Sequence, residues 1–243
     1  MLKEAIQEIV KLAGPKTFDI GGEHFASQNL CRIDPKKDFP ETIALNGLDS
    51  LCKLIRNEAT DLFCGGQLLQ ILVQVVSYNH VRVYTTLDGE MDRCYLYKCQ
   101  ADTPEAKTDR WLGHEEAVIQ LQSMYIPNED TAYLLNLLSS VSKDSKVTTL
   151  DNGVTQTVEA RKGVALMGNV QVKPRVTLRP FRTFLEVEQP ESEFILRLND
   201  NGEINLIGAD GGAWKLEAVR SIAAYFEENL KDLVEMGQVV VLR

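Results

Sequence analysis

The sequence predicts an α+β protein with mostly antiparallel β-sheets and amphipathic helices at the N-terminus, in the middle and at the C-terminus. Helical and strand-like periodicities follow one another in blocks, in the order α, β, α, β, α, and not in the alternation typical of a parallel βαβ sheet. Short turn signals separate several strand-like runs, as between antiparallel neighbours. The hydrophobic fraction of 44% and the charged fraction of 25% are those of a globular domain.

The first predicted element is an amphipathic helix over residues 2–13, where apolar side chains recur at helical spacing until a Gly-Pro pair ends it. Two glycines, Gly21 and Gly22, then predict a tight hairpin turn, because glycine adopts the positive φ angles of such turns without steric cost. The strands that they would join are 17–20 and 23–27. The N-terminal segment is therefore predicted to be a helix followed by a hairpin.

Asn46 is the predicted N-cap of a second helix, since its side-chain oxygen can accept a hydrogen bond from the first helical turn. The run 68–76 is almost wholly apolar, as in a strand that is buried on both faces. Runs 81–87 and 91–100 flank an Asp-Gly turn and complete a three-stranded meander with it. The remaining predicted elements are a helix at 113–124, a helix capped by Asn128, hairpins within 147–159 and 193–207, a long helix over 212–235 and a last strand at 239–242.

A polar stretch at 142–146 predicts a boundary between two lobes. Residues 1–145 would form an N-terminal α+β lobe, and residues 146–243 a C-terminal β-rich lobe that ends in the long helix. One continuous domain is the alternative, because 243 residues fit either arrangement.

Composition narrows the class of protein. No apolar run reaches the roughly 18 to 20 residues of a membrane span, and the N-terminus lacks a secretory pattern, so we expect a cytoplasmic protein without membrane association. Five cysteines, an odd number without a CxxC pair, predict reduced thiols and no disulfide framework. The net charge of −9 disfavours nucleic-acid binding over the whole surface, because such binding depends on basic residues.

The sequence contains no GxSxG, HExxH or GxxxxGK[ST] pattern, and its three histidines are far apart. It therefore predicts no catalytic residue, no metal site and no cofactor, and it favours a protein that is not an enzyme. Two weaker patterns remain. Glu186 and Glu188 would share one face of a strand, either as a divalent-cation pair or as solvated side chains. The segment 208–212 precedes the last helix as a phosphate-binding loop would, but Asp210 there fits a cap or turn better.

One stretch, residues 160–185, is basic and contains no Asp or Glu. Three interpretations are open: ion pairs with the acidic cluster that follows it or with the acidic last helix, an interface in a homo-oligomer, or a site for nucleic acid or an anionic ligand. Arginine forks and aromatic faces suit the last of these, since they contact phosphates and bases. The candidate binding residues are Lys173, Arg175, Arg179, Phe181 and Arg182.

Two segments carry a family resemblance: VTLRPFRTFLEVEQPESEF at 176–194 and ADGGAW at 209–214. They resemble a stretch common in phage and prophage proteins, and the chain is similar to the YfdQ-like prophage family, best over 145–235. The resemblance implies no catalytic residue. It implies a non-virion phage product that acts in the cytoplasm of the host cell.

The leading functional hypothesis is a non-enzymatic, self-associating phage binding protein that acts on a host or phage component. Sequestration of a nucleotide-type anion, or counter-defence through a host protein partner, would be its role. The alternative is an accessory nucleic-acid-binding protein in phage DNA replication or recombination.

Overall fold

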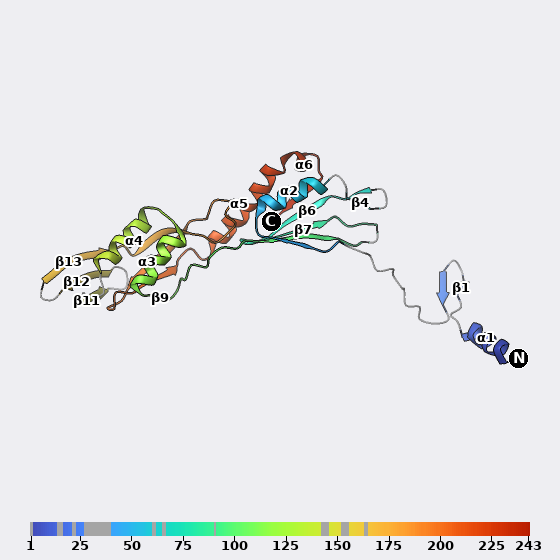
Figure 1. Cartoon of the computed structure of the whole chain (residues 1–243), viewed down its shortest axis with the longest axis horizontal. Helices are drawn as coiled ribbons and strands as arrows, with labels where there is room; N and C mark the ends of the chain where they lie inside the picture. The colour runs from blue at the N-terminus through green and yellow to red at the C-terminus, as the bar shows by residue number, and fades with distance from the viewer. Residues whose placement is uncertain are drawn as a thin grey trace. The chain divides into compact units, whose positions relative to one another are not determined.

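The computed structural model divides by its contacts into two units, Met1–Phe39 and Pro40–Arg243. In the first unit, the predicted opening helix is α1 (Leu2–Ala13; Figure 1). The predicted hairpin consists of the antiparallel strands β1 (Thr17–Ile20) and β2 (Glu23–Ala26). Both predictions are confirmed. The structure describes residues 2–13, 17–20, 23–26, 40–59, 62–64, 67–89, 91–141, 146–151, 156–162 and 165–243.

The second unit contains two five-stranded sheets, each with its own hydrophobic core. In the first sheet, the central strands pair antiparallel as the predicted meander, and the two edge strands run parallel to their neighbours. Its strands are, in spatial order, β17 (Val239–Leu242), β6 (Ile71–Ser77), β7 (His80–Thr85), β8 (Tyr95–Gln100) and β3 (Ile43–Leu45).

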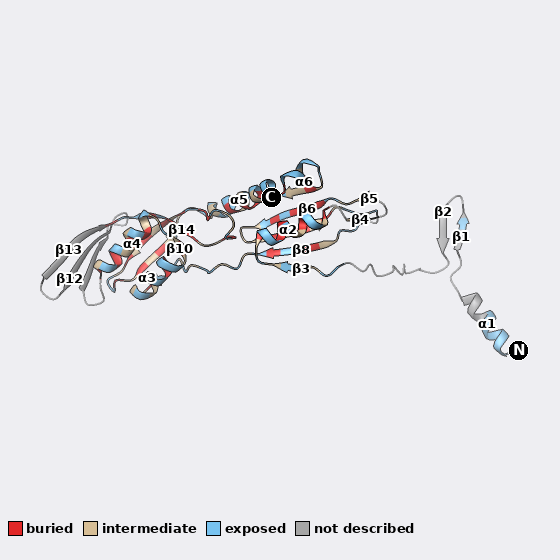
Figure 2. Cartoon of the chain, turned by 45° about the horizontal axis from the view of Figure 1, so that its top comes forward, coloured by how far each residue is buried: buried red, intermediate tan, exposed pale blue. Residues whose placement is uncertain are grey.

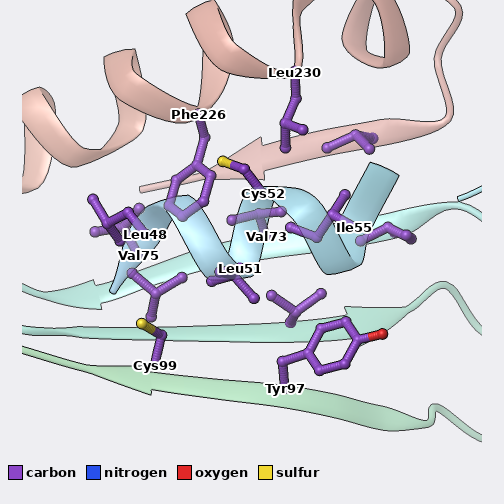
Figure 3. Packing of buried hydrophobic residues seen from close by; sticks show 14 of the residues in the cluster. Leu48, Leu51, Cys52, Ile55, Val73, Val75, Tyr97, Cys99, Phe226 and Leu230 are labelled. Carbon is purple, nitrogen blue, oxygen red and sulfur yellow. The ribbon is translucent and has the colours of Figure 1, made fainter. Parts of the chain in front are cut away.

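Three helices, α2 (Leu48–Glu58), α5 (Ala213–Asn229) and α6 (Lys231–Glu235), cover one face of the first sheet (Figures 1 and 2). Buried side chains from α2, α5 and the sheet point toward one another in this first core (Figure 3). Strand β6 buries every second residue, because successive side chains of a strand point to opposite faces. The prediction of a strand buried on both faces is therefore wrong: Gln74 is exposed, and Val76 is 43% exposed.

The second sheet is wholly antiparallel, and helices α3 (His114–Ser123) and α4 (Glu129–Ser140) pack on it to form the second core. Its strands are, in spatial order, β10 (Tyr125–Ile126), β14 (Arg175–Pro180), β15 (Ser192–Leu198), β16 (Ile204–Gly208) and β9 (Trp111–Leu112). The predicted hairpin within 193–207 is confirmed as β15 and β16.

Two small sheets complete the second unit. One consists of β11 (Lys146–Asp151), β12 (Gln156–Lys162) and β13 (Ala165–Val172), and the other of β4 (Phe63–Cys64) and β5 (Gln67–Leu68). The predicted hairpin within 147–159 is confirmed by the antiparallel pairing of β11 and β12. The α+β class with mostly antiparallel sheets is thus confirmed. Among the described helices, none has the length and apolar character needed to cross a membrane.

The contacts divide the chain between Phe39 and Pro40, whereas the sequence analysis placed a boundary at residue 145. Residues on both sides of 145 contribute to each core: Leu48 and Phe226 to the first, Leu134 and Leu196 to the second. Positions 142–145 themselves lie outside the described residues.

One of the two predicted helix caps is confirmed. Asn128 accepts a hydrogen bond from the Thr131 N–H at 2.8 Å, and the Thr131 hydroxyl accepts one from the Asn128 N–H at 2.7 Å, which is a capping box. The cap predicted at Asn46 is wrong, because the N-cap of α2 is Gly47, which has no side chain. The acceptor comes from far along the chain: Glu186 Oε1 accepts the Leu48 N–H at 2.7 Å.

Glu186→Ala is expected to lower the free energy of unfolding by about 1 kcal/mol, the usual cost of losing an N-cap. Gly47→Ala is expected to cost a similar amount, since a Cβ at Gly47 would lie 2.8 Å from Glu186 Oε1 and displace the carboxylate. In the Glu186→Ala background, Gly47→Ala should therefore cost much less. Urea denaturation of the two single variants and the double variant measures this coupling, and additive effects would contradict it.

Candidate binding pocket

Two of the five candidate residues form ion pairs with the acidic cluster that follows the basic stretch. Arg175 NH1 lies 2.5 Å from Glu193 Oε2. Arg179 contacts two carboxylates, with 2.9 Å from NH1 to Glu188 Oε1 and 2.8 Å from NH2 to Glu191 Oε1. These contacts match the first of the three interpretations of the basic stretch, that of ion pairs within the chain.

Lys173 is also paired, but with a helix of the second core. Its Nζ lies 2.9 Å from Asp130 Oδ1 on α4 and 4.7 Å from the centroid of the Tyr133 ring. The acidic C-terminal helical region forms an ion pair with a residue outside the basic stretch: Asp232 on α6 lies 2.8 Å from Arg56 on α2. Three of the five candidate side chains thus have their charges balanced by described carboxylates of the same chain.

The other two candidates, Phe181 and Arg182, line a pocket of about 650 Å³. The guanidinium carbon of Arg182 lies 4.3 Å from the centroid of the Trp214 ring and 5.3 Å from that of Phe194. Its NH1 donates a hydrogen bond to Ser192 Oγ at 2.8 Å. Cation–π contacts of this kind fix the orientation of the guanidinium plane.

The charge of Arg182 is not balanced in the same way as that of Arg175 and Arg179. No carboxylate among the described residues forms an ion pair with it. Burial lowers the pKa of Arg182, and the nearby side chains of Tyr125 and Asp210 partly counter this effect. A cation withdrawn from water is costly unless an anion lies beside it. Arg182 is therefore a pocket cation that has no direct ion pair, although the carboxylates of Asp210 and Asp109 lie near it.

The segment that leads into α5 also lines the pocket. Gly211 and Gly212 have φ angles of +62° and +83°, which favour glycine. Asp210 Oδ1 accepts a hydrogen bond from the Gly212 N–H at 3.0 Å, which confirms the turn role predicted for Asp210, whereas the N-cap of α5 is Gly212 and no side chain caps the helix. The other carboxylate oxygen, Oδ2, is buried and has no hydrogen-bond partner among the described residues. Because this oxygen has almost no exposed surface, a ligand donor would reach it only if the Asp210 side chain turned toward the pocket.

Two aromatic side chains and a second cation lie on the pocket wall. The Tyr78 and Trp214 rings meet edge to face, with centroids 4.7 Å apart and planes at 63°. Lys215 Nζ lies 5.8 Å from the Tyr78 centroid and 5.7 Å from that of Trp214. The Thr183 hydroxyl donates to the Tyr78 carbonyl oxygen and so ties the β6–β7 turn to the 181–191 loop. The pocket thus combines aromatic ring surface with two cations, Arg182 and Lys215, and three carboxylates, those of Glu105, Asp109 and Asp210.

The pocket is lined by residues from three segments, 100–109, 181–194 and 208–215, together with Tyr78 and Asn79. Sequence reasoning found Phe181 and Arg182 but assigned Trp214 to the apolar stripe of the last helix. Trp214 instead lies on the pocket wall and is partly exposed. The neighbouring Lys215, a charged residue next to the aromatic ring, was the sequence feature that could have indicated this. Nothing in the sequence pointed to Tyr78, which comes from a turn of the first sheet.

The acidic pair Glu186 and Glu188 does not lie on a strand. Both residues belong to the 181–191 loop, where Glu186 caps α2 and Glu188 pairs with Arg179. The prediction that they share a strand face is therefore wrong. No group of three or more His, Cys, Asp or Glu among the described residues is arranged to hold a metal ion.

Three cysteines and His114 have structural surroundings. Cys52, Cys94 and Cys99 are free thiols, and burial raises the pKa of Cys52 to about 11 and that of Cys99 to about 12. His114 Nε2 lies 3.0 Å from the Leu138 carbonyl oxygen, which can only accept a hydrogen bond, so this nitrogen carries the proton.

No family model matches the chain, and no match was found among curated proteins or among solved structures.

Proposed function

We propose that the chain is a non-enzymatic binding protein that takes a nucleotide-type anion in the Arg182 pocket. The observation that carries the proposal is the partly buried guanidinium of Arg182, stacked on Trp214 and without a carboxylate partner among the described residues. A phosphate would offer the guanidinium two oxygens in the bidentate geometry that arginine prefers, closer than the carboxylates of Asp210 and Asp109, which form no ion pair with it. The pocket volume of about 650 Å³ lies in the range of small-molecule sites.

Two further features favour a nucleotide over inorganic phosphate. The aromatic side chains of Tyr78, Phe181 and Trp214 supply apolar surface for a planar base. The buried, unpartnered Oδ2 of Asp210 calls for a hydrogen-bond donor. Guanine presents N–H donors on its base-pairing edge, and a carboxylate is an acceptor only. GMP is therefore the first probe, with guanosine and AMP as comparisons.

Trp214 provides the readout. The chain has two tryptophans, and Trp111 lies outside the pocket on β9 with its side chain 45% exposed. In a Trp111→Phe background, GMP is expected to change the Trp214 fluorescence saturably, and guanosine is expected to bind more weakly because it lacks the phosphate. Arg182→Met in the same background should weaken GMP binding at least tenfold, since the removed cation is worth about 1.4 kcal/mol or more against a phosphate.

Arg175→Gln is the matched control, because it removes an arginine that is already paired with Glu193 outside the pocket. Its GMP affinity should equal that of the parent protein. A titration without a saturable change for GMP, AMP or inorganic phosphate would overturn the proposal. So would equal losses in the Arg182 and Arg175 variants. Chromatography of GMP after incubation tests the non-enzymatic part, which turnover would contradict.

The biological setting is part of the same proposal and rests on the resemblance to the YfdQ-like prophage family. A self-associating phage product that sequesters a nucleotide-type signal in the host cytoplasm would act in counter-defence. Native mass spectrometry of the protein as purified should then show a defined oligomer with added mass on each chain. A monomer without added mass would contradict both sequestration and self-association.

The alternative function, nucleic-acid binding through Lys173, Arg175, Arg179, Phe181 and Arg182, is less favoured by the geometry, because Lys173, Arg175 and Arg179 are already paired. Each of these cations lies beside a carboxylate at 2.5–2.9 Å. A phosphate backbone would have to displace these carboxylates before it gained the cations.

A further inference from the structure

The first sheet has a second face, which none of the three helices of its core covers. Strand pairing places Tyr84 of β7 beside Tyr95 of β8, and Arg82 beside Lys98. These side chains alternate with buried residues such as Val81 and so lie on the face opposite the first core. Helices α2, α5 and α6 all lie on the core side (Figures 1 and 2).

Aromatic rings and bases lie together on this open face. The Tyr84 and Tyr95 rings stack with centroids 4.9 Å apart and planes at 22°. A hydrogen bond with Tyr84 raises the pKa of Arg82. Burial, and then repulsion from Arg82 and Lys98, lower the pKa of His80. The strand register supports this grouping, because Arg82 pairs with Lys98 across the strands and His80 lies two residues before Arg82 on the same face of β7.

The strands of this sheet also carry no acidic residue. The chain contains 35 Asp and Glu, yet the five strands β17, β6, β7, β8 and β3 contain neither at any position. Neither Arg82 nor Lys98 forms an ion pair with a described carboxylate, and Arg82 Nε is buried without a hydrogen-bond partner among the described residues. The chain has a net charge of −9, whereas the strands that form this sheet face carry basic residues and no acidic ones.

We propose that the open face of the first sheet binds single-stranded nucleic acid. Stacked tyrosines on central strands offer ring surface to unpaired bases, and Arg82 and Lys98 offer charge to the phosphates between them. A duplex keeps its bases stacked internally, so it would use the charges alone. A second copy of this chain, with its net charge of −9, is the competing occupant, and the experiment below distinguishes it.

The site is separate from the Arg182 pocket, so either proposal can be correct when the other is wrong. The pocket adjoins the end of the same strands, where Asn79 and Gln100 line its wall and Gln100 pairs with His80. A test must therefore tell the two sites apart. Lys53 on α2 provides the matched control, since it is an exposed cation on the helix-covered side of the sheet.

The experiment is fluorescence anisotropy with a labelled oligothymidylate of about 15 nucleotides at low and at physiological salt. We expect binding that weakens with salt. Arg82→Gln with Lys98→Gln should weaken it at least tenfold and lower the salt slope by about 0.7 for each phosphate that the variant no longer neutralises. Tyr95→Leu, which keeps apolar bulk, should weaken binding about tenfold because the bases can no longer stack on its ring. Lys53→Gln should leave the affinity unchanged.

Absence of binding at low salt would overturn the proposal. So would binding that the Arg82 and Lys98 variant leaves intact and that GMP displaces, because the oligonucleotide would then lie in the pocket. A third result would overturn it too: a dimer that the same double variant dissociates, together with no oligonucleotide binding, would assign the face to a second copy of the chain. Circular dichroism and thermal melting of each variant establish that the sheet remains folded.

Discussion

Phe226→Ala is expected to lower the free energy of unfolding by about 3–5 kcal/mol, the range for removing a buried phenylalanine ring. Phe226 has no exposed surface and points from α5 toward α2 and the sheet (Figure 3). Ile222 and Leu230, four residues away on either side, are also fully buried. The truncated side chain would leave a cavity between two helices and a sheet that are fixed by their other contacts, so little of it can close.

Leu216→Ala on the same helix is the control, because the Leu216 side chain is 56% exposed. Its effect should stay within about 0.5 kcal/mol, as for most surface substitutions. Urea denaturation followed by circular dichroism measures both variants. Similar losses for the two substitutions would mean that α5 does not pack on the first sheet as Figure 3 shows.

The predictions that the structure confirms rest on local interactions. The Asn128 capping box closes within four residues, and the hairpins are set by the short turns between their strands. The cap of α2 could not be predicted in the same way. Its acceptor, Glu186, lies 138 positions after Leu48, and no spacing rule relates two residues that only the tertiary fold brings together.

The basic stretch shows the same limit at the candidate site. Arg179 and Arg182 are three residues apart, yet one is paired with two glutamates and the other is stacked on Trp214. The difference arises because β14 ends at Pro180. Arg179 lies within β14, beside the carboxylates of the 181–191 loop. Arg182 lies beyond the end of the strand, in the loop itself. The composition showed that the stretch is basic. It did not show where β14 ends, and the end of this strand determines which arginine lines the pocket.

The chain continues from Arg182 through a loop that one buried side chain organises, that of Gln189. Its Oε1 accepts hydrogen bonds from the backbone N–H groups of Arg182 and Thr183 at 2.8 and 3.1 Å. Its Nε2 donates to the Phe184 carbonyl oxygen at 2.9 Å. Gln189 is 3% exposed, and Phe184 belongs to the first core. The same amide thus fixes both the backbone of Arg182 and the loop residue that anchors it.

Gln189→Ala is therefore expected to lower the free energy of unfolding by about 3 kcal/mol, since each buried backbone group left without a partner costs about 1–3 kcal/mol. The variant should also lose most of its GMP affinity under conditions where it remains folded, because the guanidinium of Arg182 is no longer held against Trp214. Urea denaturation and the Trp214 fluorescence titration give the two readouts.

Glu191→Gln, two residues further along the same loop, separates these effects. It removes an exposed contact with Arg179, and such surface pairs contribute about 0–1 kcal/mol, so both readouts should stay close to those of the parent protein. If Gln189→Ala lost stability but kept its GMP affinity, the amide would serve the first core alone and Arg182 would be oriented by its ring contacts. If both readouts fall together, the loop that anchors the first core is also the part that sets the geometry of the pocket.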